Sequence, residues 1–196
     1  MNNQPEWSVR LSELDLGSEE IRRVVDVLES EWLTMGPETE AFEAAFARFL
    51  DVKHSIAVTN GTAALHLAHH VMDIGPGDEV ITHVPGWPSI GEQVLLAGAD
   101  LIRVRTSVED GFELSAATIL NAVNSRTRGI IINSPGNPTG ALIRETELEQ
   151  LVYGIEDRDI WLILDLCYEQ LIYDRQPHNL IGVVGSRIPD RTVIVG

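Results

Sequence analysis

Apolar and polar positions follow two different periods along this chain. Up to about residue 50 the apolar residues recur at helical spacing, and one such stripe consists of Ile21, Val24, Val25 and Leu28. From about Lys53 onward, short apolar runs alternate with segments of helical period. Runs of this kind predict strands that are buried on both faces, and the segments between them predict helices. The pattern therefore predicts an α/β fold with a boundary near residue 50.

The elements can be placed from this pattern. We expect an extended arm over residues 1–16, then one helix that opens at Ser18 with its hydroxyl as cap, and a second that starts at Pro37. Strands are predicted at 55–58, 79–82, 101–104, 129–132, 160–164 and 192–195, and helices at 62–72, 88–96, 115–123 and 144–153. Because helical crossovers join parallel strands, we expect a mostly parallel (mixed) sheet covered by helices on both faces. Two parts are predicted, residues 1–50 as an arm with a helical segment and residues 51–196 as the α/β domain.

The composition of the chain indicates which classes of partner it should not bind. The chain has 196 residues, 30 acidic against 14 basic, and a net charge of −16, so it should repel nucleic acid and anionic lipid. No apolar run approaches the roughly 18 residues of a membrane span, and no leader-like segment opens the chain. The single cysteine, Cys167, excludes an internal disulfide. We expect a soluble cytoplasmic protein with one ordinary domain core and no nucleic-acid or membrane partner.

Polar side chains follow two of the predicted strands. Asn133-Ser-Pro-Gly-Asn-Pro-Thr-Gly140 comes after the run 129–132, and Asp165-Leu-Cys-Tyr168 comes after the run 160–164. Polar groups at the carboxyl ends of neighbouring buried strands are typical of a small-molecule site on an open α/β sheet. The carboxylate of Asp165 should be held in a place of low dielectric, where it needs a hydrogen-bonding or cationic partner such as a protonated ring nitrogen. The alternative is a cap after the strand.

Two further turns are candidates for the same site. Asn60-Gly61-Thr62 joins a strand to a helix, and free backbone N–H groups at a helix start, with the Thr62 hydroxyl, can bind an anion. The alternative is an ordinary turn with a Thr cap. Trp87, between Gly86 and Pro88, could stack on a heteroaromatic ring, or it could anchor the loop. Neither of the common nucleotide-binding glycine fingerprints is present.

Other reactive residue types favour structural roles. The histidines that could be considered as metal ligands are His66, His69, His70, His83 and His178. No cysteine or carboxylate pattern completes a recognisable site around them, so we predict no metal. Cys167 has no positioned base in its motif and is predicted to be a buried small apolar residue rather than a nucleophile.

The motifs resemble those of pyridoxal-phosphate (PLP) aminotransferases of fold type I. From about Gly75 to Gly196 the chain is similar to class I/II aminotransferases. The segments that carry this similarity are Pro76–Val80, Arg126–Arg128, Asn133–Gly140, Asp165–Tyr173 and Arg191–Val195. From about Leu16 to Asp78 it is more similar to DegT-type nucleotide-sugar aminotransferases, through Glu19-Glu20, Trp32–Thr34, Gly36–Glu38, Phe42-Glu43 and Asn60–Leu65.

The resemblance implies PLP as cofactor and a PLP-transferase large domain, which residues 51–196 would form in part and which would be incomplete at the C-terminus. It implies that Gly61, Thr62 and Ala63 bind the phosphate and that Trp87 stacks on the ring. It further implies that Asn137 and Tyr168 bind the phenolic oxygen, and Asp165 the ring nitrogen. No catalytic residue is assigned, because the Schiff-base lysine of the family follows the last matching strand and the only lysine here is Lys53.

The expected activity is transfer of an amino group from a small-molecule amino donor to a keto acceptor, either a keto acid or a keto-sugar. The chain resembles an N-terminal portion of such an enzyme, which would be a homodimer at full length. A PLP-dependent lyase or decarboxylase is an alternative within the class. The alternative from another class is a catalytically inactive fragment or pseudoenzyme that binds a ligand or partner chains.

Overall fold

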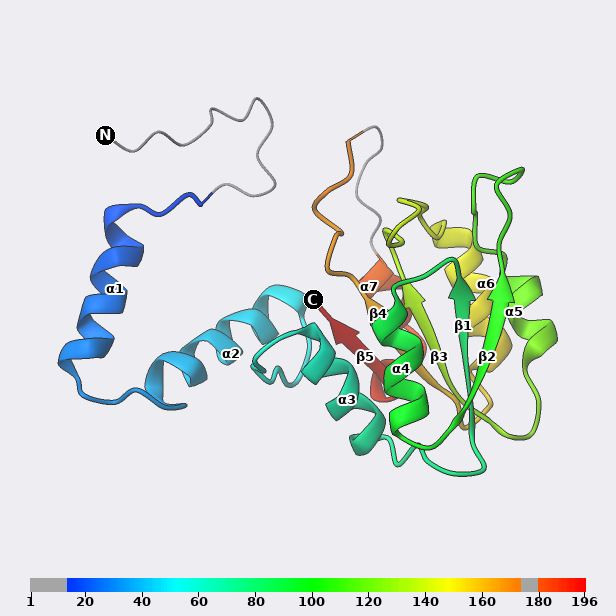
Figure 1. Ribbon diagram of the computed structural model, residues 1–196, viewed down its shortest axis with the longest axis horizontal. Coiled ribbons are helices and arrows are strands. Elements are labelled where there is room, and N and C mark those ends of the chain that lie inside the picture. Colours follow the sequence, from blue (N-terminus) through cyan, green and yellow to red (C-terminus); the bar gives the residue numbers. More distant parts are fainter. Residues whose placement is uncertain (1–13, 174–179) are drawn as a thin grey trace. The chain divides into compact units, whose positions relative to one another are not determined.

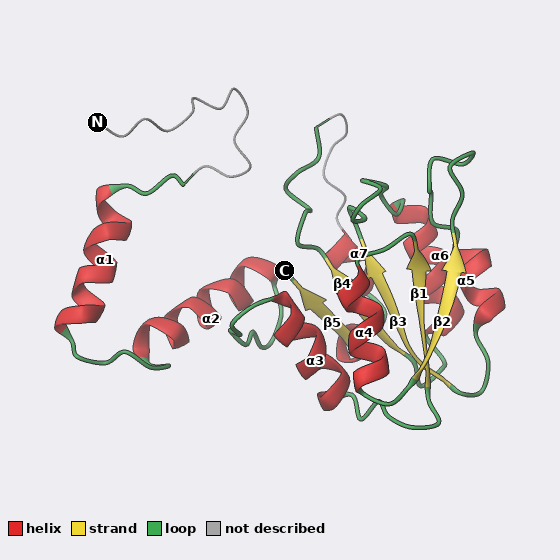
Figure 2. Cartoon of the chain, viewed as in Figure 1, coloured by secondary structure: helices red, strands yellow, loops and turns green. Residues whose placement is uncertain are grey.

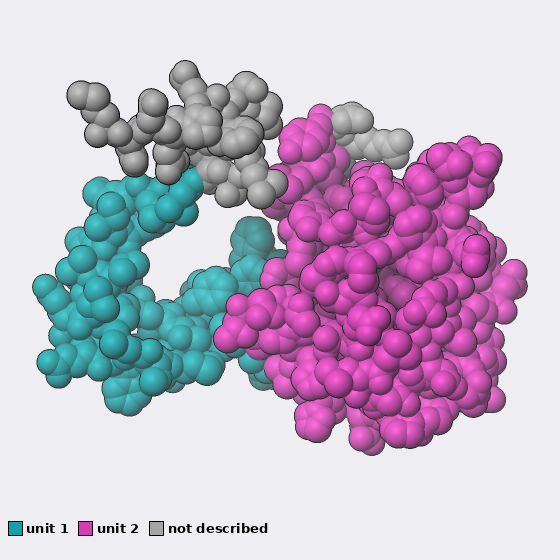
Figure 3. All heavy atoms as spheres, viewed as in Figure 1, with its two compact units in different colours: residues 1–57 teal, residues 58–196 magenta. Residues whose placement is uncertain are grey.

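The computed structural model describes residues 14–173 and 180–196. The chain divides into two compact units, residues 1–57 and residues 58–196 (Figure 3). Most of the arm predicted over residues 1–16, and also His178, lie outside the described residues. No helix among residues 14–173 and 180–196 is both long enough and apolar enough to cross a membrane.

In the described residues 14–57 the first unit contains two helices, α1 (Ser18–Glu29) and α2 (Pro37–Leu50). The predicted Ser18 cap is wrong, because Gly17 occupies the capping position and its N–H donates to the Glu20 carboxylate at 2.9 Å. Pro37 stands at the start of α2, as predicted, where its missing N–H costs no helical hydrogen bond. The helix ends at Leu50 and is capped by Asp51, whose φ of 53° is left-handed.

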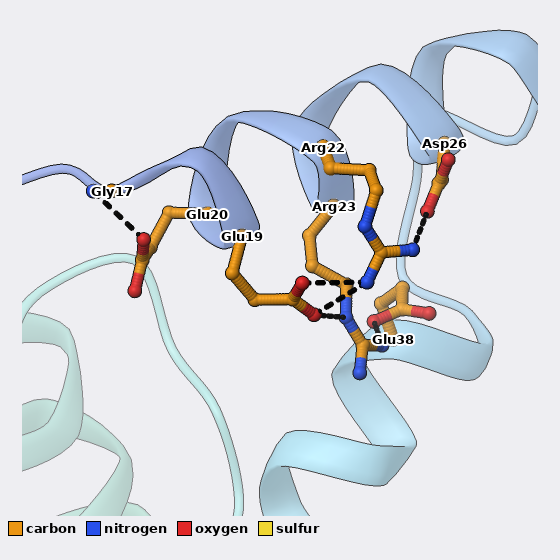
Figure 4. A network of polar contacts seen from close by, with 7 residues as sticks. All are labelled: Gly17, Glu19, Glu20, Arg22, Arg23, Asp26 and Glu38. Carbon is orange, nitrogen blue, oxygen red and sulfur yellow. Dashed lines mark hydrogen bonds and ion pairs between the residues drawn. The ribbon is translucent and has the colours of Figure 1, made fainter.

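Charged side chains link the two helices of this unit (Figure 4). The Glu19 carboxylate accepts from Arg22 at 2.6 Å and from Arg23 at 3.3 Å, and Arg23 also reaches Glu38 of α2 at 3.5 Å. These side chains are more than half exposed, so water and salt screen the pairs and their contribution to stability is small. The network therefore orients the helices more than it stabilises them.

The second unit is a five-stranded sheet with helices on both faces (Figures 1 and 2). The strands are β1 (Glu79–Val84), β2 (Asp100–Arg105), β3 (Thr127–Asn133), β4 (Trp161–Asp165) and β5 (Thr192–Val195). The helices are α3 (Gly61–Val71), α4 (Pro88–Leu96), α5 (Ala116–Ala122), α6 (Glu145–Ile155) and α7 (Leu180–Gly185), with a 3-10 turn η1 (Pro189–Arg191). Strand order is β2-β1-β3-β4-β5, and every neighbouring pair is parallel. The predicted fold class is confirmed.

Side chains of the central strands alternate between two apolar cores. Ile130 and Ile132 of β3, like Leu162 and Leu164 of β4, pack in the core that holds α5, α6 and α7. Ile131 and Ile163 point the other way, into the core that holds Leu65 of α3 and Val94 of α4. All of these residues are fully or almost fully buried. The continuous apolar runs in the sequence thus reflect strands with a helix layer on each side.

One predicted strand is wrong and one helix was not predicted. Residues 55–58 form no strand, since they pair with no strand among the described residues, and Ile56 is 65% exposed. Helix α7 has no clear signal in the sequence because two glycines and three β-branched residues make up most of its six positions. Leu180 and Val184, four residues apart, hold it in the core.

The amino ends of the strands carry an ion-pair cluster. The carboxylate of Glu79, at the start of β1, is almost fully buried; it accepts from the Arg126 guanidinium and, at 2.6 Å, from the Asn124 amide. Arg126 also donates to Asp100 of β2 at 2.8 Å. These contacts tie β1, β2 and the segment before β3 together at the edge of the sheet opposite the candidate site described next.

Candidate active site

Two polar residues end neighbouring strands at the carboxyl edge of the sheet. Asn133 of β3 and Asp165 of β4 are register partners, and each is only 2% exposed. They continue the alternation of Ile131 and Ile163, so their side chains belong to the face covered by α3 and α4. The structure therefore brings the ends of the two predicted motifs together on one face.

The Asp165 carboxylate has few partners for a buried charge. It accepts from the Cys167 N–H at 3.4 Å, and the Cys167 thiol also hydrogen-bonds to it. No Lys, Arg or His of the described segments pairs with it. Burying a carboxylate without a cation or several donors is costly, so the site is suited to a ligand that brings a positive charge.

Cys167 differs from its prediction, since it is exposed rather than buried. Desolvation and the neighbouring Asp165 carboxylate raise the pKa of its thiol to about 11. At neutral pH the thiol stays protonated, which argues against a nucleophilic role.

The loop after β3 is held by its own hydrogen bonds. The Asn137 N–H donates to the Asn133 side-chain oxygen at 2.8 Å, and the Gly136 N–H donates to the Ala141 carbonyl at 2.8 Å. The Ser134 hydroxyl accepts from the Ile143 N–H at 3.1 Å. The Asn137 side chain is half-buried and makes no hydrogen bond within the described chain, so its amide is available to a ligand.

Tyr168 lies in the turn that follows β4. Its backbone carbonyl accepts from the Leu171 N–H at 2.9 Å, and the preceding Leu166 carbonyl accepts from Glu169 at the same distance. The side chain is 39% exposed, and its hydroxyl has no partner in residues 14–173 or 180–196. Like the Asn137 amide, the phenol is free to donate.

The start of α3 offers backbone donors on the same face of the sheet. Asn60, not Thr62, caps this helix, and its side-chain oxygen accepts from the Ala63 N–H at 2.9 Å. The N–H groups of Gly61 and Thr62 meet no acceptor among the described residues. A Cβ added at Gly61 would meet nothing within 4 Å, so open space lies beside the Gly61 Cα. An anion can approach the two N–H groups there.

Trp87 is the residue before α4 and is half-buried. It packs against the apolar core of the α3 and α4 face, as does Ala64 from the first turn of α3. The indole is thus partly a packing residue, as one reading of the sequence suggested, and it belongs to the same face as Asp165.

His83 is the site neighbour that the sequence did not indicate. It is almost fully buried near the end of β1, and its Nε2 lies 3.2 Å from the Asn133 N–H. Burial is the largest influence on the imidazole and lowers its pKa below the usual value. Fifty residues separate the partners, so only the strand order reveals the contact. In the described part of the chain, no three His, Cys, Asp or Glu side chains are grouped so as to hold a metal ion.

Known proteins match this chain over most of its length. A model of the DegT/DnrJ/EryC1/StrS aminotransferase family matches residues 14–167. The aspartate aminotransferase of Bacillus subtilis (strain 168) is 36% identical over 140 residues, which are 71% of this chain and 35% of the relative. The aspartate aminotransferase of Bacillus sp. (strain YM-2) is 31% identical over 137 residues, which are 69% of this chain and 35% of the relative.

Solved structures agree. A Thermus thermophilus aspartate aminotransferase mutant superposes with a TM-score of 0.77 at 28% identity, covering 93% of this chain and 52% of that one. The aromatic aminotransferase of Pyrococcus horikoshii OT3 gives a TM-score of 0.79 at 25% identity, covering 93% and 51%.

The chain spans about a third of the length of the curated relatives it matches. Both branches that the sequence motifs resemble are present among the matches, one as the family model and the other as the aspartate aminotransferases. The expected fold-type-I aminotransferase resemblance is confirmed. With the family model extending from α1 to the turn after β4, this chain belongs to the DegT/DnrJ/EryC1/StrS aminotransferase family.

Proposed function

We propose that this chain forms the cofactor-binding part of a PLP-dependent aminotransferase. The observation that carries the proposal is the buried Asp165 carboxylate, which is hydrogen-bonded by Cys167 alone and has no cationic partner in the described chain. A protonated pyridine nitrogen would supply the missing charge. Family membership supports the same cofactor.

The remaining residues fit the other groups of PLP. The free N–H groups of Gly61 and Thr62 and the Thr62 hydroxyl suit the phosphate, whereas Ala63 would have to share an N–H that Asn60 already accepts. Trp87 would cover one face of the ring and exclude water. Asn137 and Tyr168 would donate to the phenolic oxygen, which favours its ionised form.

When bound, PLP supplies an electron sink for the negative charge that develops when a substrate Cα–H bond breaks. Asp165 maintains that capacity by holding a proton on the ring nitrogen. Its own burial strengthens the interaction, because a charge pair in a place of low dielectric is poorly screened. The rigid loop around Asn137 keeps the donor in place without a large loss of entropy on binding.

The substrates belong to the proposal as well. Aminotransferases take an amino donor and a keto acceptor, and the relatives are named as aspartate aminotransferases. We include in the proposal a cytoplasmic location and a homodimer, as the resemblance implies. The second candidate is a catalytically inactive fragment or pseudoenzyme that binds a ligand or partner chains, and β5 at the edge of the described sheet favours it because an edge strand can pair with another chain.

The cofactor site is tested with pyridoxamine 5′-phosphate, which has no aldehyde and cannot react with Lys53. We expect saturable binding in a fluorescence titration, weakened about 10- to 100-fold by Asp165→Asn through loss of a charge-assisted hydrogen bond. Asp157→Asn is the matched control, because it makes the same chemical change at an exposed position before β4. Equal affinities of the two variants would remove Asp165 from the site.

The lysine question needs a second assay. PLP is added to the chain, reduced with borohydride and mapped by mass spectrometry, in the wild type and in Lys53→Arg. If Lys53 carries a stoichiometric label that Asp165→Asn abolishes, then Lys53 serves the site. Slow labelling that is indifferent to Asp165 indicates nonspecific chemistry, and the second candidate role then accounts for the chain better.

A further inference from the structure

We propose that His83 and Asn133 are positioning residues of this site, forming a buried relay that holds the Asn137 loop and the Asp165 strand end in one geometry. The inference rests on the proposed function for its purpose, but the relay itself is a property of the chain. Neither side chain belongs to the ligand-binding residues assigned above.

Asn133 is the centre of the relay. Its side-chain oxygen accepts from the Asn137 N–H at 2.8 Å, and its side-chain nitrogen donates to the Asp165 carbonyl at 3.3 Å. Both ends of the amide are therefore used, and each by a different element. The residue is 2% exposed, so water cannot replace either contact easily. The Asn133 amide thus fixes the spacing between the loop after β3 and the end of β4.

His83 supports Asn133 from the neighbouring strand. The Asn133 N–H points at Nε2, and since that group is a donor, Nε2 must act as an unprotonated acceptor. In a neutral imidazole the proton then belongs on Nδ1. Burial keeps the pKa of His83 low, which is consistent with a neutral ring in this role.

The chain of contacts runs across three strands. It starts on β1 with His83, passes through Asn133 of β3, and ends on β4 and on the loop that presents Asn137. A ligand held by Asp165 and Asn137 requires the two to keep a fixed separation, since misplacement of binding groups weakens their interactions steeply. The relay supplies that fixed separation without touching the ligand.

The first test observes the wild-type chain. Nitrogen-15 NMR of the imidazole at neutral pH should show Nδ1 protonated and Nε2 unprotonated. A protonated Nε2 or a charged ring would overturn the relay, and this result does not depend on how any variant folds.

The second test uses hydrogen exchange of the chain without cofactor. Asn133→Leu should speed exchange of the Asn137 N–H about tenfold, the loss of one hydrogen bond, whereas Asn133→Asp keeps the acceptor and should preserve protection. His83→Leu should speed exchange of the Asn133 N–H by a similar factor. The control His69→Leu removes a buried histidine from α3 instead, and should leave exchange of the Asn133 N–H unchanged. Equal effects of His83→Leu and His69→Leu would show general destabilisation and refute the relay.

Cofactor binding separates this inference from the proposed function. With pyridoxamine 5′-phosphate, Asn133→Leu should weaken affinity about tenfold, because it loses the contacts to the Asn137 loop and to the Asp165 carbonyl without adding a charge. If the wild type binds no cofactor while the NMR and exchange results hold, the proposed function fails and the relay stands. If binding is intact and unaffected by the relay variants, the positioning role fails.

Discussion

The ion-pair cluster at the amino edge of the sheet allows a quantitative prediction. Among the described residues, Arg126 is the charged partner of the buried Glu79 carboxylate, so Arg126→Met leaves that carboxylate with the Asn124 amide. Removing one partner of a fully buried pair costs about 3–5 kcal/mol of unfolding free energy. Arg126 is itself 54% exposed, so its own desolvation contributes little. We therefore expect a loss of about 2–3 kcal/mol.

Two comparisons isolate the cause. Asp100→Asn breaks the outer pair of the same arginine, in which both side chains are mostly exposed, and should cost about 1 kcal/mol or less. The double variant Arg126→Met with Glu79→Leu removes the buried charge as well, and should recover much of the loss because an apolar replacement of a buried pair is close to neutral.

Urea unfolding followed by circular dichroism gives the free energies, and thermal unfolding checks them. For a chain of this size, 1 kcal/mol corresponds to about 2–4 °C in Tm. If Arg126→Met and Asp100→Asn cost the same within about 0.5 kcal/mol, the buried carboxylate does not depend on Arg126 and the reasoning is wrong.

Three other outcomes can be checked. Because the pKa of Cys167 is raised to about 11, its rate of alkylation by iodoacetamide should increase about tenfold per pH unit up to about pH 11. Asp165→Asn should increase the alkylation rate at pH ~8, and a rate that stops rising near pH ~9 would contradict the raised pKa. Burial lowers the pKa of both His69 and His83, so the unfolded chain binds protons more readily than the folded chain. The unfolding free energy, measured by urea titration, should therefore fall as the pH drops below about 6.5, and this fall should be smaller in His69→Leu. Arg191 donates at 3.3 Å to the carbonyl of Ile155, the last residue of α6, and to that of Ile160 beyond it. Arg191→Ala should therefore lose about 2 kcal/mol in thermal unfolding, and an unchanged Tm would exclude this capping role.

The sequence predicted elements correctly where the residues that start and stop an element agree with its pattern of apolar positions. β3 and β4 were predictable because an unbroken apolar run between turn residues is typical of a strand covered on both sides. Helix α4 was placed with its observed bounds because Pro88 marks a first helical position and Gly98 follows the end. Positions of the site motifs followed directly, since both stand where these strands end.

The failures have physical reasons. Residues 55–58 have strand-forming side chains, but a strand exists only with a hydrogen-bonded neighbour, which no local pattern reveals. Ser18 is a good cap by residue type, yet Glu20 satisfies the N–H of Gly17 and moves the helix start by one. Cys167 was expected to be a buried small apolar residue because its motif has no positioned base, whereas the turn after β4 exposes it.

The contact between His83 and Asn133 is a feature that could not be predicted from a single sequence. Its two ends lie on β1 and β3, and β2 comes between them in the chain but not in the sheet. The strand order β2-β1-β3 places β1 beside β3, and both residues are buried, so water cannot easily replace their contact. Predicted roles for Gly61, Thr62, Ala63, Trp87, Asn137, Asp165 and Tyr168 stay predictions, which cofactor titration and borohydride labelling address.

The alternation of side chains on β3 and β4 also limits how this region can change in length. Deleting or inserting one residue inside either strand would turn its final polar side chain toward the α5, α6 and α7 layer, away from its neighbour's. Point substitutions in these strands alter packing, but a single-codon change in length would separate Asn133 from Asp165. Length variants in directed evolution should therefore be sought in the exposed loop around Glu109 and Asp110, and libraries should leave the two strands at their present size.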